Sequence, residues 1–129
     1  MKYEAIPEAT EAVARSIIGA AIAVHRALGP GFLERVYREA LCYELASRSV
    51  PFETEKPIVV RYRNLDIKCQ RADMVVDARV IVELKAISRL DGIHEAIVMS
   101  YLRSTRLRLG LLMNFHAPTL KEGLKRIVL

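Results

Sequence analysis

The sequence predicts an α/β fold in which helices flank one mixed β-sheet. Three observations lead to this expectation. Apolar residues recur at helical three-and-four spacing in the first part of the chain, short runs rich in Val, Ile and Tyr dominate its middle, and one more helical pattern precedes a final apolar run. The predicted order is therefore two helices, several strands, a third helix and two further strands.

Two helices are expected before residue 50. Pro7, followed by Glu8 and Glu11, is typical of a first helical turn, and the Gly-Pro-Gly sequence at 29–31 ends the apolar periodicity that follows it. A second helix is expected over about residues 32–48. The two would form a helical hairpin, with apolar stripes made by Val13, Ile17, Ala20, Ala21, Val24 and Leu28 and by Leu33, Val36, Tyr37, Ala40, Leu41 and Leu45.

The pattern changes to β after Pro51. A helix is then expected over about residues 93–105, and the apolar run 109–115 suits a strand buried on both faces. Residues 126–129 are expected to pair at the sheet edge. Before that helix, strands are expected over 52–55, 58–63, 67–70, 72–76 and 80–85, with a turn at Asn64-Leu65.

Composition indicates one folded domain over residues 1–129. Hydrophobic residues make up 52% of the chain and charged residues 27%, which excludes a disordered polymer. Cys42 and Cys69 match neither a zinc spacing nor a disulfide framework. The first residues carry Glu4 and Glu8 instead of a basic leader, and no apolar stretch is long enough to cross a bilayer. We therefore expect a cytoplasmic protein with no membrane partner.

Charged residues on the predicted strands point to chemistry. Strand side chains alternate in direction, so Glu83 and Lys85 point to one face and Leu84 to the other. Charges on an otherwise apolar Val-Ile-Val run are unfavourable unless a metal or counter-ion accompanies them. Asp73 precedes Glu83 by ten residues, which is the spacing of a metal-dependent phosphodiesterase site. A plainer alternative stays open, in which all three are solvated residues near strand ends and turns.

In the phosphodiesterase interpretation, Asp73 and Glu83 hold Mg²⁺ or Mn²⁺ with several waters, and Lys85 orients or helps to deprotonate the attacking water. The turn between the strands tests this idea. A two-residue turn, Asp77-Ala78, would set Asp73 opposite Val82 and leave Glu83 on the other side. A turn that also includes Arg79, or a bulge of one residue, would set Asp73 across from Glu83, and we predict this second register.

Basic residues add a further hypothesis. The net charge is +5, which favours an anionic partner such as nucleic acid. Arginines 103, 106 and 108 cluster after the third helix, and arginines 61, 63 and 71 lie on the expected hairpins. Their guanidinium groups suit phosphate oxygens, although the same residues could simply form solvated faces. Without interleaved aromatic residues, stacking on single strands is not indicated.

Several segments in this order resemble the GxxExxY protein family, which is grouped with the PD-(D/E)xK nuclease superfamily. The resemblance runs from about residue 18 to residue 128. Its motifs are Gly31-Phe-Leu-Glu34-Arg-Val-Tyr37, Arg71-Ala-Asp73, Glu83-Leu-Lys85-Ala, Tyr101-Leu-Arg103 and Gly110-Leu-Leu-Met-Asn-Phe115. The i,i+3 spacing of Glu34 and Tyr37 places both side chains on one helical face. Without the resemblance, Glu34 would be explained as an acidic residue at the start of a helix and Tyr37 as a core residue.

The resemblance implies a restriction-endonuclease-like core and a Mg²⁺- or Mn²⁺-dependent nuclease acting on DNA or RNA. It puts Asp73, Glu83 and Lys85 at catalytic positions, with Glu34 as an additional acidic contributor; Arg71, Tyr101 and Arg103 are the expected substrate contacts. One position departs from the family pattern, because Ile97 stands where relatives often carry glutamine. Either His94 supplies a polar group instead, or the protein is a weakened or inactive module that binds nucleic acid or a protein partner. A homo-oligomer is also left open.

Overall fold

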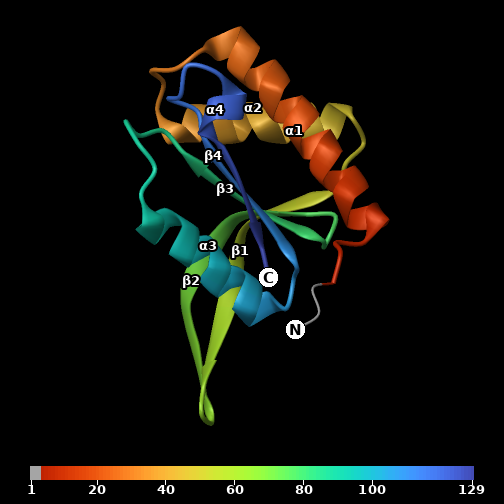
Figure 1. Cartoon of the computed structure of the whole chain (residues 1–129), viewed down its shortest axis with the longest axis vertical. Helices are drawn as coiled ribbons and strands as arrows, with labels where there is room; N and C mark the ends of the chain where they lie inside the picture. The colour runs from red at the N-terminus through yellow and green to blue at the C-terminus, as the bar shows by residue number, and fades with distance from the viewer. Residues whose placement is uncertain (1–3) are drawn as a thin grey trace.

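Five strands form one mixed sheet in the order β1-β2-β3-β4-β5 (Figure 1). The computed structural model describes residues 4–129. β3 and β4 run parallel, whereas the other neighbours are antiparallel. The fold is therefore the α/β architecture predicted from the sequence. Its strands are β1 (Phe52–Tyr62), β2 (Leu65–Val76), β3 (Val80–Lys85), β4 (Leu109–Asn114) and β5 (Leu124–Val128).

Helices cover both faces of the sheet (Figure 1). α1 (Glu8–Leu28) and α2 (Glu34–Ser47) pack on one face in a core that includes Met74 and Leu84. α3 (Gly92–Thr105) packs on the other face in a core that includes Val75 and Ile81. Neighbouring strand residues thus enter opposite cores, as the alternation of a strand requires. A short helix that the sequence patterns did not indicate, α4 (Leu120–Gly123), leads into β5.

Local signals explain most element boundaries. Pro7 is the N-cap of α1, and Gly29 ends that helix with a positive φ of 69°, which favours glycine. α2 begins at Glu34, two residues after the expected start, because Leu33 is still extended with φ −67° and ψ 150°. Every residue of β4 is buried, and β5 pairs with β4 at the sheet edge, so both predictions for the final strands are confirmed.

The long β1–β2 hairpin differs from the expected short strands. The segments predicted separately over 52–55 and 58–63 form one strand, and so do those over 67–70 and 72–76. Pro57 does not interrupt β1, because β1 is an edge strand in which a missing N–H donor can face solvent. The far end of this hairpin projects away from the rest of the molecule (Figure 1).

Tyr37 holds the loop between α1 and α2. Its ring is fully buried and stacks on Phe115 with centroids 4.7 Å apart. Its hydroxyl donates a hydrogen bond of 2.6 Å to the Gly29 carbonyl oxygen and accepts one of 3.1 Å from the Phe32 N–H. The tyrosine of the Gly31–Tyr37 motif is therefore a core residue with a structural contact.

We expect Tyr37→Phe to lower the free energy of unfolding by about 2 kcal/mol, because two backbone groups lose their hydrogen-bond partner. Urea denaturation measures the change. Tyr43→Phe is the matched control, since Tyr43 is 72% exposed and should tolerate the loss of its hydroxyl. Equal stability of the two variants would contradict a structural role for the Tyr37 hydroxyl.

Candidate active site at the end of the β2–β3 ladder

The register between β2 and β3 brings Asp73 and Glu83 to the same face of the sheet. Val76 pairs with Val80 and Met74 with Val82, so three residues, Asp77 to Arg79, make the turn. Asp77 and Ala78 adopt positive φ values of 50° and 53° there. The three-residue turn predicted from the sequence is confirmed, and the next residues along the two strands are the two carboxylates.

Each carboxylate binds the backbone of the opposite strand. Backbone pairing of β2 with β3 ends at Met74 and Val82. Beyond that point, the Asp73 N–H donates to Glu83 Oε1 at 2.8 Å, and the Leu84 N–H donates to Asp73 Oδ2 at 2.8 Å. The two side chains therefore take over the hydrogen bonds that the ladder would have made, and their positions are fixed by the backbone.

One oxygen of each carboxylate remains open. Within residues 4–129, neither Asp73 Oδ1 nor Glu83 Oε2 accepts a hydrogen bond. Neither oxygen is fully buried, so each can be reached from solvent. Ionised carboxylates are acceptors only, so these atoms require a donor or a cation. The arrangement presents two fixed oxygens to whatever enters between the strands.

Burial shapes the acid–base behaviour of the pair. Glu83 is only 5% exposed, and burial, helped by the nearby charge of Asp73, raises its pKa to about 7. Burial also raises the pKa of Asp73, while the Leu84 N–H and the charge of Lys85 oppose this rise. Two acids that resist ionisation beside one lysine form a site whose charged state a cation would stabilise.

Glu34 enters the same electrostatic environment from α2. Burial and the charge of Asp73 raise the pKa of Glu34, whereas Lys85 and Arg38 lower it. The structure therefore brings together the four predicted catalytic residues, which arrive from three separate elements. Arg38 lies one helical turn after Glu34 and also lowers the pKa of Asp73. Sequence reasoning missed Arg38, although its i,i+4 spacing from Glu34 was a usable signal.

Glu55 is a second residue that the sequence did not reveal. It lies in β1 between the pairs Thr54–Met74 and Lys56–Ala72, directly across from Asp73, and its φ is +48°. A non-glycine residue in this conformation inside a strand is strained. Its carboxylate lies 3.8 Å from Arg38 and raises the pKa of Asp73. The backbone of β1 is thus irregular directly across from Asp73.

Asn114 fixes the segment that follows Lys85. It is the β4 neighbour of Lys85, and its buried amide accepts from the Ile87 N–H at 3.1 Å and donates to the Ile87 carbonyl at 2.9 Å. The direction of the chain after Lys85 is therefore set by a polar clamp. Its only sequence signal was a polar residue at the end of an apolar run.

The position that departs from the family pattern lies on α3. Ile97 packs against the α3-side core. His94 Nδ1 accepts a 2.9 Å hydrogen bond from the Asp91 N–H at the start of the helix. The Nδ1 atom of His94 is thus engaged in capping α3, and the side chain of Ile97 offers no polar group.

The three predicted substrate contacts have different surroundings. Tyr101 is 7% exposed, and burial together with the charges of Glu83 and Asp73 raises its pKa to about 12, so its hydroxyl stays protonated near the carboxylates. Arg71 is exposed on β2, opposite Pro57. Arg103 is also exposed, but it follows Tyr101 by two positions in α3, so its side chain points about 200° around the helix axis from that of Tyr101. It lines a separate groove between α3 and β1.

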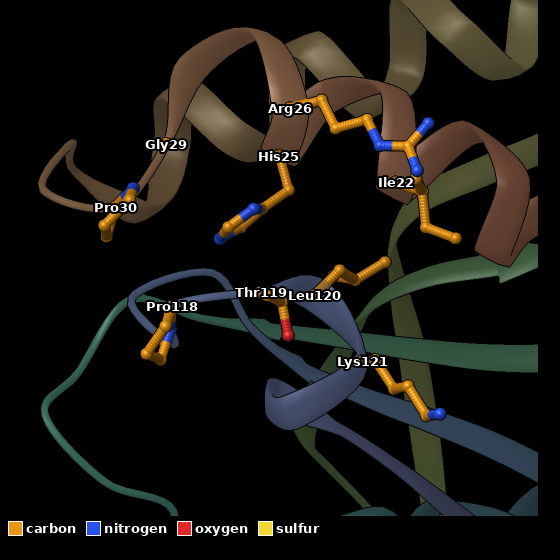
Figure 2. Close-up of a pocket in the computed structure, with 9 residues that line it drawn as sticks. All are labelled: Ile22, His25, Arg26, Gly29, Pro30, Pro118, Thr119, Leu120 and Lys121. Atoms are coloured by element: carbon orange, nitrogen blue, oxygen red, sulfur yellow. The ribbon is translucent and has the colours of Figure 1, made fainter.

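A cavity of about 530 Å³ lies elsewhere, between the end of α1 and α4 (Figure 2). None of the predicted site residues lines it. Figure 2 shows the His25 ring lying between α1 and the α4 segment, and its Nε2 is 2.9 Å from the Ala117 carbonyl oxygen. His25 is 7% exposed and connects two elements, so its environment is that of a structural histidine.

Two further findings concern residues 4–129. Among residues 4–129, no group of three or more His, Cys, Asp and Glu side chains is placed to hold a metal ion. An ion at Asp73 and Glu83 would therefore need water or backbone carbonyl oxygens for its remaining ligands. No helix in this part of the chain combines the length and apolar character needed to span a membrane.

Comparison with known proteins identifies the family. Residues 11–127 match the model of the PD-(D/E)XK nuclease superfamily. Searches of curated proteins and of solved structures gave no match. The matched segment includes every strand of the sheet except the last residue of β5, as well as all four residues that converge at the end of the β2–β3 ladder. The chain therefore belongs to the PD-(D/E)XK nuclease superfamily.

Proposed function

We propose that the protein is a metal-dependent nuclease that hydrolyses phosphodiester bonds in DNA or RNA through Asp73, Glu83, Lys85 and Glu34. One observation carries the proposal. Asp73 and Glu83 bind each other's strand through one oxygen and leave the second oxygen open, close enough to Lys85 for its charge to oppose the rise in both pKa values. Membership of the nuclease superfamily supports the same chemistry.

The donor set fits a hard divalent cation. Mg²⁺ is bound by oxygen ligands and keeps several waters, so two carboxylates are enough to hold it at a nuclease site. When bound, Mg²⁺ or Mn²⁺ supplies Lewis-acid polarisation of the scissile phosphate. Because the pKa of Glu83 is raised to about 7, ion binding near neutral pH should release a proton from Glu83.

The remaining groups of the site have distinct tasks in this proposal. Lys85 orients the attacking water or assists its deprotonation and offsets the charge that develops on the phosphate. Glu34 adds an acidic group beside Asp73. The protonated Tyr101 hydroxyl can donate to a substrate oxygen, and Arg71 and Arg103 contact the nucleic acid backbone.

Further assignments belong to the same proposal. We place the chain in the GxxExxY family on the Gly31, Glu34 and Tyr37 spacing, and we regard residues 1–129 as one PD-(D/E)xK-like domain, because all five strands join one sheet. Both cysteines are free, which favours a reducing compartment such as the cytoplasm. A homo-oligomer or a protein partner would be compatible with this nuclease.

A second candidate function rests on Ile97. If the missing glutamine is needed for turnover, the protein is a nuclease-fold module that binds nucleic acid or a protein partner without cutting. In that case Asp73→Ala should retain the nucleic acid affinity of the wild type. The same substitution in a nuclease removes a ligand of the ion and with it the ion-dependent cleavage.

Digestion of a mixed panel of nucleic acids distinguishes the two functions. We expect the wild type to cut at least one of single-stranded DNA, duplex DNA, single-stranded RNA and duplex RNA when Mn²⁺ or Mg²⁺ is present, and none in EDTA. Asp73→Ala should be inactive in both buffers. Cleavage that persists in EDTA, or a wild type that binds the panel without ever cutting it, would contradict the nuclease proposal.

A further inference from the structure

A basic groove of about 400 Å³ lies between β1 and the second half of α3. It is separate from the carboxylates, because none of the four proposed catalytic residues lines it. Three of its lining residues are arginines that come from two elements, and none is acidic. The groove is lined by Val59, Val60, Arg61, Ser100, Arg103, Ser104 and Arg106.

The positive charge of this groove is largely unbalanced. Arg103 and Arg106 are exposed, and neither forms an ion pair with a carboxylate in residues 4–129. Arg61 lies 3.5 Å from the exposed carboxylate of Asp66, and its Nε donates to the Arg63 carbonyl at 3.0 Å. Cations gathered in one concave surface repel each other and attract an anion.

The end of a helix explains part of this arrangement. Cations near a helix C-terminus are favoured by the helix dipole, which suits Arg103 in the last turn of α3 and Arg106 at its C-cap. The dipole does not explain Arg61, which comes from β1. Nor does it explain why the left-handed C-cap, with φ 62°, carries arginine where glycine or asparagine is usual.

We propose that this groove is a second phosphate-binding site, which holds the nucleic acid backbone at a distance from the bond that is cut. The inference rests on the proposed nuclease function and adds a substrate contact to it. Guanidinium groups bind phosphate oxygens through paired N–H donors, and Ser100 and Ser104 leave the groove uncrowded because their hydroxyls donate to their own helix.

The distance along β1 sets the expected footprint. Arg61 follows Glu55, the residue across from Asp73, by six positions. Six residues of strand span up to about 20 Å at about 3.3 Å each. Phosphates of one duplex strand repeat about every 3.4 Å along the axis, so the groove reaches up to about six nucleotides from the scissile bond.

The projecting hairpin favours duplex over single-stranded substrate. From the Pro57–Arg71 pair outwards (Figure 1), it carries exposed Arg63, Lys68 and Arg71, and its only aromatic residue in 53–71 is Tyr62. The Arg63 guanidinium already lies 5.6 Å from the centre of the Tyr62 ring. A row of stacking platforms, which single-strand binding uses, is therefore missing from this hairpin, whereas contacts to backbone phosphates need only the cations.

Fluorescence anisotropy in EDTA tests the groove without turnover. The probes are a labelled DNA duplex of about 20 base pairs, the RNA duplex of the same length and the corresponding single strands, titrated over a range of salt. We expect Arg103→Gln/Arg106→Gln to lower the slope of log Kd against log salt by about 1.8 for a duplex, at about 0.9 per lost phosphate contact. Arg61→Gln, on the other element, should lower it by about 0.9.

The matched control is Arg15→Gln/Arg48→Gln, which removes the same charge from α1 and the end of α2, where the two arginines pair with Glu8 and Glu44. Its slope should stay near that of the wild type. Equal slopes for the groove and control variants, or a wild type that binds none of the probes, would overturn the inference. A protein that fails to cut in Mn²⁺ but shows the groove-dependent slope in EDTA would refute the nuclease proposal and leave the phosphate site standing.

Discussion

Glu83→Gln is expected to make the metal-free protein more stable above pH 7 and to abolish its cleavage of nucleic acid. Burial raises the pKa of Glu83 from its ordinary 4.5 to about 7 in the folded protein. Below pH 4.5 the side chain is protonated in both states and contributes nothing. As the pH rises towards 7, the unfolded chain releases the proton while the folded chain retains it, so folding becomes less favourable.

The size of this effect follows from the two pKa values. Above pH 7 the buried charge destabilises the folded state by on the order of 3 kcal/mol. Glutamine carries no charge and keeps an Oε1 acceptor for the Asp73 N–H. Urea denaturation in EDTA should therefore show a gain in the free energy of unfolding at pH 8 and none at pH 4. Glu39→Gln, at an exposed position, should show no such gain at either pH.

Divalent ions provide the second half of this prediction. At pH 8, Mg²⁺ or Mn²⁺ should raise the melting temperature of the wild type, because an ion that binds only the folded state stabilises it. The ion should have little effect on Glu83→Gln. Equal stabilisation of both proteins by the ion would show that Glu83 is not an ion ligand. A variant that is less stable than the wild type at pH 8 would show that the buried charge of Glu83 does not destabilise the folded protein.

Lys85→Ala is expected to reduce ion-dependent cleavage by at least about a hundredfold, the usual effect of removing one charge-stabilising group from a transition state. Folding should change little, because Lys85 is only half-buried at the end of β3 and forms no ion pair within residues 4–129. Initial rates on the most readily cut nucleic acid measure the first effect, and urea denaturation measures the second.

Two variants sharpen the Lys85 experiment. Lys121→Ala removes an exposed lysine of α4 and should keep wild-type rates. Lys85→Arg keeps the charge but replaces a compact ammonium by a planar fork, so it should recover only part of the activity. A Lys85→Ala protein with wild-type rates would remove Lys85 from the proposed mechanism, whereas joint loss of activity and stability would indicate a structural role.

The residue pattern alone predicted the order of the elements, apart from α4, and the face of the sheet on which the charged residues lie. Alternation along β3 placed Glu83 and Lys85 together, and the requirement that Asp73 join them selected a three-residue turn, which the structure shows. These inferences succeeded because the period of a strand is fixed by its backbone and because a shift of one residue reverses every side chain.

The contacts that hold the site, and the groups that surround it, became visible only in the folded chain. Glu83 accepts from the Asp73 N–H and Asp73 accepts from the Leu84 N–H, Glu55 adopts a left-handed conformation across from Asp73, and Asn114 clamps Ile87; each of these depends on contacts between different strands or segments. Local propensity carries no record of such contacts. The raised pKa of Glu83 and the groove shared by Arg61 and Arg106 have the same origin, because burial and the meeting of charges exist only when the chain is folded.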